Sequence, residues 1–149
     1  MDLIIRNACI LQSGELRTVD IGIVGPAIVA IAPDLEGDAP ELQAAGCLVT
    51  SGLIETHIHL DKTCILDRCH IEEGTVAEAV RITAAAKRDF TVEDVYARGK
   101  RTLERCITHG TMRMRTHVEL DPGIGMIGFE AVEQLARDHA WAMDIELCV

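Results

Sequence analysis

The sequence has few aromatic side chains and no excess of basic ones. Phe, Trp and Tyr make up 3% of the 149 residues, and Asp and Glu outnumber Lys and Arg by 24 to 14, a formal net charge of −10. Nucleic acids and anionic membranes are bound through basic patches, so this balance argues against both as partners. The hydrophobic content of 48% indicates a globular domain with an aliphatic core.

Long apolar runs and paired cysteines are also missing. No stretch reaches the length of about 18 apolar residues that a membrane span needs, and "MDLIIRNACIL" does not resemble a secretion signal. The six cysteines are scattered and none forms a C-x-x-C pair. Such cysteines are typical of reduced thiols, so a cytoplasmic location is expected.

Residues 1–50 are predicted to form a small all-β module. The runs "DLIIRNACIL", "VDIGIVG" and "PAIVAIAP" are rich in β-branched residues, and Gly or Pro stands at their ends. Residues 34–46 have no clear periodicity and are expected to be a polar loop.

Residues 51–149 are predicted to alternate strands with helices. The strand candidate "CLVTSGLIETHIHL" is followed by two segments with helix-start spacing, Thr75 with Glu78 and Thr91 with Asp94. "TMRMRTHVEL" alternates as a strand does, residues 128–140 have helical spacing, and "MDIELCV" is a further strand. This order predicts parallel βαβ units, and the third strand is expected to leave the sheet incomplete.

Two histidines stand two residues apart in "GLIETHIHLDK". On a strand, His57 and His59 point to the same side, with Cα atoms about 6.5 to 7 Å apart. Imidazoles of that reach can converge on one metal ion. Hydrogen-bonded core histidines or exposed strand-end histidines are the alternatives, and the pattern alone does not decide between them. Glu55 is expected to lie one layer deeper and to meet Arg115 of the neighbouring strand.

The remaining histidines are given structural roles. His117 and Glu119 repeat the two-residue spacing on the next strand, where a polar layer with Arg113 and Arg115 is favoured over metal binding. The lone histidines, namely His70, His109 and His139, are not expected to be functional.

Taken together, "CLVTSGLIETHIHLDKT" and "HGTMRMRTHVELD" resemble the metal-dependent amidohydrolases. They are most similar to the cytosine deaminase branch and to its relative N-isopropylammelide amidohydrolase, and the resemblance runs over nearly the whole chain. It implies an α/β fold, namely the N-terminal part of a (β/α)8 TIM barrel preceded by strands of a small β-sandwich. Residues 1–50 would supply the sandwich strands, and residues 51–149 the first three barrel strands with their helices.

The resemblance also implies an activity, namely hydrolytic deamination of a cytosine-like or related nitrogen heterocycle by a metal-activated water. His57 and His59 would be ligands of a divalent metal, Fe2+ or Zn2+. Val76, Asp61 and Lys62 would lie at the substrate. The acid/base residues of the family fall beyond Val149, so no catalytic residue is expected within the chain.

Some features depart from the family pattern. Ser51 stands where a proline often precedes the glycine, and "VGPAI" replaces a glycine-rich turn. The alternative interpretation is a truncated, catalytically incomplete fragment or a non-catalytic interaction chain. Besides the heterocycle, the partner expected is a second copy of the chain or a complementing C-terminal segment.

Overall fold

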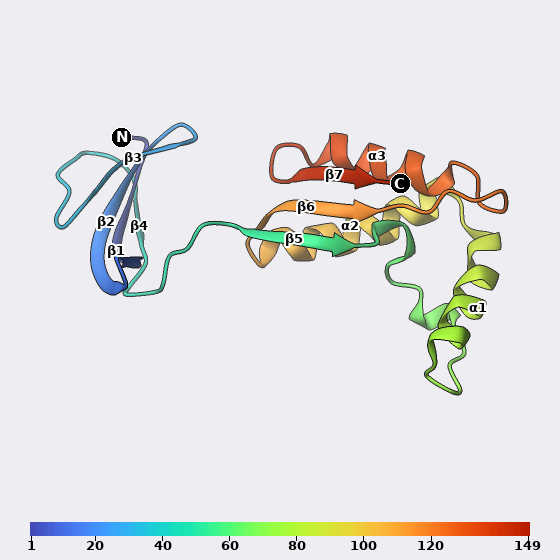
Figure 1. Ribbon diagram of the computed structural model, residues 1–149. Helices are drawn as coiled ribbons and strands as arrows, with labels where there is room; N and C mark the ends of the chain where they lie inside the picture. Colours follow the sequence, from blue (N-terminus) through green and yellow to red (C-terminus); the bar gives the residue numbers. More distant parts are fainter. The chain divides into compact units, whose positions relative to one another are not determined.

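The computed structural model describes residues 1–149, and the chain divides into two units, Met1–Ser51 and Gly52–Val149 (Figure 1). Both α-helices and β-sheets are present, as an α/β fold requires. No helix combines the length and the apolar character that a membrane crossing demands.

The N-terminal unit is a four-stranded sheet in the order β3-β2-β1-β4. Its strands are β1 (Leu3–Gln12), β2 (Glu15–Val24), β3 (Ala27–Ala32) and β4 (Glu41–Gln43). β1 and β2 pair antiparallel, as do β2 and β3, whereas β4 is parallel to β1. The three predicted strands are confirmed. The expectation that residues 34–46 form only a loop is wrong, because β4 lies within them and is too short to show a pattern.

A partly buried ion-pair network connects β1, β2 and β4. The guanidinium of Arg6 donates to Asp20 at 2.6 Å and to Glu41 of β4 at 2.6 Å. Asp20 also accepts the backbone N–H groups of Asn7 at 3.0 Å and Leu35 at 3.1 Å. The hydrogen bond from Arg6, followed by that from Asn7, lowers the pKa of Asp20. These contacts tie the loop after β3 to the sheet.

The C-terminal unit is a parallel sheet in the order β5-β6-β7, with helices covering one face (Figure 1). Its elements are β5 (Leu53–Ile58), α1 (Val76–Ala86), α2 (Val92–Thr108), β6 (Thr111–His117), α3 (Ile127–Asp138) and β7 (Asp144–Cys148). The predicted alternation is therefore confirmed. The carboxyl ends of the three strands share one edge, and α1 lies beyond that edge.

The core of this unit lies between the sheet and the two helices α2 and α3. Met114 of β6 packs with Leu103 of α2 and with Val132 and Leu135 of α3, and all four side chains are fully buried. Gly99 permits the helices to approach, since a Cβ there would lie 2.6 Å from a Leu135 methyl group. The amphipathic spacing read in the sequence is thus the packing surface of both helices.

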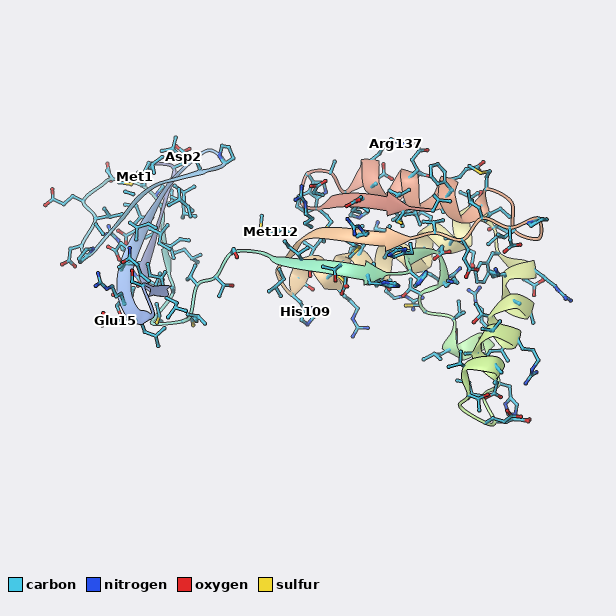
Figure 2. All side chains as sticks on the ribbon, viewed as in Figure 1. Met1, Asp2, Glu15, His109, Met112 and Arg137 are labelled. Atoms are coloured by element: carbon cyan, nitrogen blue, oxygen red, sulfur yellow. The ribbon has the colours of Figure 1, made fainter.

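β5 begins later than predicted. The sequence places a strand from Cys47, but residues 47–49 bond to β1 of the N-terminal unit, where Cys9 donates to the Cys47 carbonyl at 3.0 Å and accepts from Val49 at 2.7 Å. The irregular step at Ser51–Gly52 marks the real boundary. Gly52 lies against the side chain of Met112, which leaves no room for a Cβ. Met112 and His109, both labelled in Figure 2, flank the turn from α2 into β6.

The other face of the sheet carries cross-strand ion pairs. Arg113 contacts Asp144 at 2.7 Å and Arg115 contacts Glu146 at 3.1 Å, each pair in register between β6 and β7. The prediction that Glu55 contacts Arg115 is wrong. The Glu55 side chain instead accepts the backbone N–H of His57 at 2.9 Å. The alternation predicted for β6 is confirmed, with Met114 and Thr116 buried and the two arginines exposed.

The first turn of α1 begins at the predicted pair of Thr75 and Glu78, which forms one of the two hydrogen bonds of a capping box. Thr75 Oγ1 accepts the Glu78 N–H at 3.2 Å. The Glu78 carboxylate in turn accepts the N–H groups of Glu72 at 2.8 Å, Glu73 at 2.9 Å and Gly74 at 2.7 Å. Two carboxylate oxygens therefore satisfy three backbone donors, and these bonds, the Glu72 one foremost, lower the pKa of Glu78.

Glu78 should make the loop before α1 sensitive to acid. A lowered pKa in the folded state adds stability that is complete above the ordinary value of 4.5 and is lost as the pH falls through the folded value. We expect the hydrogen-exchange protection of the three loop amides to fall in that window. Glu78→Gln, which keeps one acceptor oxygen, should lower their protection already at neutral pH.

The matched control is Glu104→Gln on α2. Glu104 is exposed and pairs only with Lys100, at 3.8 Å. That variant should leave the protection of residues 72–74 unchanged. Equal protection in the Glu78→Gln variant and the wild type would contradict the role given to this carboxylate.

Candidate metal centre

Three imidazoles gather at the carboxyl edge of the sheet. His57 lies near the end of β5, His59 follows it by two residues, and His117 ends β6. The ring centroids of His57 and His59 are 5.4 Å apart. The His117 ring stacks on His57 at 4.2 Å and lies 5.7 Å from His59. The sequence grouped His117 with the arginines of β6, whereas the structure brings it to the two predicted ligands.

The chain turns sharply after His59. A short 3-10 helix, Leu60–Lys62, folds Leu60 and Asp61 into the interior, where both are fully buried. The N–H of Leu60 donates to Thr116 Oγ1 of β6 at 3.1 Å. Arg98 of α2 donates to the carbonyls of Asp61 at 3.3 Å and Thr63 at 2.6 Å. The backbone beside the imidazoles is therefore fixed from two sides.

The Asp61 carboxylate points into the interior from this turn. Its Oδ2 accepts the backbone N–H of Glu119 at 3.0 Å. Its Oδ1 is buried and has no hydrogen-bond partner, and the same holds for Nδ1 of His59. These two atoms are 3.9 Å apart. The predicted role of Asp61 at the substrate stays a prediction.

Alternating charges extend from this turn toward α1. Glu119 accepts from Lys62 at 2.5 Å and from Lys87 at 2.5 Å, and Lys87 also donates to Asp121 at 2.7 Å. The bond from Lys62, followed by that from Lys87, lowers the pKa of Glu119. Burial acts to lower the pKa of Lys87, but its bonds to Asp121 and Glu119 outweigh burial and raise it. Sequence reasoning missed this network because Lys87 is 32 residues from Glu119.

A cavity of about 320 Å³ opens between α1 and this network. Lys62, Lys87 and Glu119 line its charged side, and Val76 and Val80 of α1 line its apolar side together with small residues. Val76 is 82% exposed, so helix packing does not account for its side chain. Two of the predicted substrate residues, Lys62 and Val76, thus border one cavity.

The residues present fit part of a metal site. Zinc and iron take neutral imidazole nitrogens as ligands, and burial, followed by the nearby Lys62 ammonium, lowers the pKa of His59 from its ordinary 6.5. The unpartnered Nδ1 of His59 faces a buried carboxylate, as in many metal-bound histidines. No group of three or more His, Cys, Asp or Glu side chains is arranged to hold a metal. The two histidines therefore fit as a partial ligand set.

The other histidines have structural partners or solvent around them. Nδ1 of His109 lies 2.6 Å from the Arg105 carbonyl at the end of α2, and Nδ1 of His139 lies 3.0 Å from that of Leu135. The His70 side chain is 87% exposed and lies beside Glu72. None of them reaches the three-imidazole cluster.

Comparison with curated proteins gives relatives that are hydrolases. The chain is 30% identical over 152 aligned residues to N-isopropylammelide isopropyl amidohydrolase of Pseudomonas sp. (strain ADP), covering 98% of this chain and 37% of that protein. It is 31% identical to allantoinase of Salmonella choleraesuis (strain SC-B67), covering 93% of this chain and 34% of the allantoinase. The chain thus spans about a third of the length of these relatives. No family model matches.

Comparison with solved structures also finds a hydrolytic enzyme, a deaminase. The 5-methylcytosine deaminase of Klebsiella pneumoniae, liganded with 5-fluorocytosine, superposes with a TM-score of 0.82 at 26% identity. The match covers 97% of this chain and 35% of the deaminase. Other structures that share the fold include zinc complexes of an atrazine chlorohydrolase.

Proposed function

We propose an activity on the premise that the homologues and structural neighbours of this chain are amidohydrolase-superfamily enzymes, hydrolases of C–N bonds other than peptide bonds. The proposed activity is metal-dependent hydrolytic deamination of a nitrogen heterocycle that carries an exocyclic amine, as cytosine or an aminotriazine does. The fold proposed with it is a (β/α)8 barrel that begins at β5, with the N-terminal sheet as part of a small β-sandwich.

The observation that carries the proposal is the pairing of His57 and His59 at the carboxyl edge of a parallel sheet, where α/β enzymes keep their chemistry. These two imidazoles would hold a divalent metal, Zn2+ or Fe2+, together with at least one further ligand. When bound, such a metal lowers the pKa of a coordinated water so that hydroxide is available near neutral pH. The residues of this chain supply ligand atoms and a rigid turn behind them.

The cavity between α1 and the charge network would receive the substrate. Its apolar side, with Val76 and Val80, suits the face or an alkyl substituent of a ring. On its other side, the ammonium groups of Lys62 and Lys87 can donate to carbonyl oxygens carried by the ring while Glu119 holds the ammonium groups in place. No side chain of residues 1–149 is proposed to transfer the proton.

The alternative, an incomplete fragment or a non-catalytic interaction chain, has less support. Both relatives compared and the deaminase neighbour are enzymes. The cluster of imidazoles and the buried carboxylate beside it also favour a chemical site over a docking surface. A second copy of the chain or a complementing C-terminal segment stays a proposed partner.

The test is release of ammonia or amine from candidate rings. The protein, in the form in which its source expresses it, is loaded with zinc or iron. It is then given 5-methylcytosine, N-isopropylammelide and allantoin in parallel. We expect amine release from a ring with an exocyclic amine and none from the His57→Ala/His59→Ala variant. Ring opening of allantoin releases no amine and is followed separately, by the loss of allantoin. Ring opening of allantoin without amine release from the other two rings would overturn the deaminase proposal in favour of ring-amide hydrolysis, and activity that survives in the variant would overturn the metal site.

Val76 gives a second test of the same site. Because its side chain is 82% exposed, Val76→Ser should change the free energy of unfolding by no more than about 0.5 kcal/mol. If the side chain meets the substrate, KM should rise several-fold with a smaller change in kcat. Val29→Ser, at an exposed position of β3, is the matched control and should change neither constant. An unchanged KM in Val76→Ser would remove this residue from the substrate site.

A further inference from the structure

Two buried polar atoms face each other without partners beside the candidate metal centre. Nδ1 of His59 and Oδ1 of Asp61 are both shielded from solvent, and neither makes a hydrogen bond. A buried polar atom without a partner costs free energy, so such atoms are rare and call for an explanation. The distance between the two is 3.9 Å, about 1 Å longer than a hydrogen bond.

The position of the Asp61 carboxylate is fixed by its surroundings. Oδ2 accepts the Glu119 N–H at 3.0 Å, and the Asp61 carbonyl accepts from Arg98. The Gly128 backbone packs against the same side chain, since a Cβ there would lie 3.3 Å from Cβ of Asp61. Because Oδ2 already accepts a hydrogen bond, only Oδ1 is free to accept another. The group that Oδ1 faces is His59.

We propose that Asp61 is a positioning residue that selects the tautomer of His59. Oδ1 accepts the proton of Nδ1 once the His59 ring moves about 1 Å toward the fixed carboxylate. The Nδ1–H tautomer leaves Nε2 without a proton, and an unprotonated nitrogen is what a metal ion binds. The inference deepens the proposed function and rests on it for the identity of the ligand.

Asp61→Asn is a sharp test because it changes one atom and keeps the shape. The Glu119 N–H needs an acceptor, so the amide oxygen of Asn should take the place of Oδ2. The NH2 group then occupies the place of Oδ1 and donates toward His59. A donor at that point requires an unprotonated Nδ1, so the proton moves to Nε2, where it blocks a metal.

The readout is the tautomer of His59 in the metal-free protein, from long-range 1H–15N correlation spectra at a pH where the ring is neutral. We expect Nδ1–H in the wild type and Nε2–H in Asp61→Asn, with zinc affinity lowered by about 10- to 100-fold in the variant. Asp20→Asn is the matched control, since Asp20 is a buried carboxylate of the other unit, and it should leave the His59 tautomer unchanged.

The outcomes separate the two proposals. An Nε2–H tautomer in the wild type would overturn the role of Asp61, and this observation needs no variant. Finding the same tautomer in the wild type and in Asp61→Asn would also overturn it. The expected tautomers in a wild type that binds no zinc would support the role of Asp61 and overturn the metal site. A tautomer that also changes in Asp20→Asn would count against the inference.

Discussion

Replacing Arg98 by alanine should lower the free energy of unfolding of the C-terminal unit by about 2 to 4 kcal/mol. The guanidinium is 2% exposed and donates to the carbonyls of Asp61 and Thr63, which would lose their partner. It also pairs with Asp94 at 3.0 Å and stacks over Phe90 at 4.3 Å. Each buried acceptor left without a donor costs about 1 to 3 kcal/mol, and lost packing adds to this. Urea unfolding monitored by far-UV circular dichroism measures the change.

Arg101→Ala is the matched control for this prediction. Arg101 lies on the same helix but is exposed, so its loss should change stability by no more than about 0.5 kcal/mol. Arg98→Lys should resemble Arg98→Ala, because one ammonium group cannot replace a planar fork that reaches several acceptors. Equal unfolding midpoints for Arg98→Ala and Arg101→Ala would show that the turn after β5 does not depend on this cation.

Removing both imidazoles at the end of β5 should strongly weaken metal binding. We expect His57→Ala/His59→Ala to lower zinc affinity by at least about 100-fold, because losing two ligands must exceed the roughly 10- to 100-fold cost of losing a neighbouring hydrogen-bond partner. Competition with a chromogenic chelator measures the affinity. His57 is exposed and His59 partly exposed, so the fold should survive and the comparison remains valid.

His70→Ala controls for non-specific binding to surface imidazoles. Its side chain is 87% exposed and lies outside the cluster. Zinc affinity in this variant should match that of the wild type. If the double variant retained wild-type affinity, the metal would have to bind elsewhere in the chain.

Local signals allow most of the secondary structure to be predicted. The capping-box spacing at Thr75 and Thr91 indicates the starts of α1 and α2, because the N-cap bond that it predicts lies within one helical turn. Strict alternation indicates the two faces of β6, because neighbouring residues of a strand point to opposite faces. β4 and the start of β5 cannot be found in this way. β4 has three residues, and the chain before Gly52 pairs with β1, which is distant in sequence.

The site can be predicted only in part. The two-residue spacing of His57 and His59 is enough to propose ligands, because strand geometry fixes where both point. The stacking of His117 on His57 depends on how β5 and β6 pair, and spacing within either strand does not contain it. In the sequence, Asp61 has the position of a loop residue. Its burial follows from the packing of Gly128 and Glu119 against the turn, more than 50 residues away in sequence.

The most direct test of the central claim is X-ray absorption at the zinc edge of the zinc-loaded protein. The proposed centre predicts nitrogen scatterers about 2.0 to 2.1 Å from the metal with the outer-shell pattern of imidazole, and loss of that pattern in His57→Ala/His59→Ala. A first shell of oxygen or sulfur without imidazole, or a wild-type spectrum unchanged in the double variant, would contradict a metal centre at the end of β5.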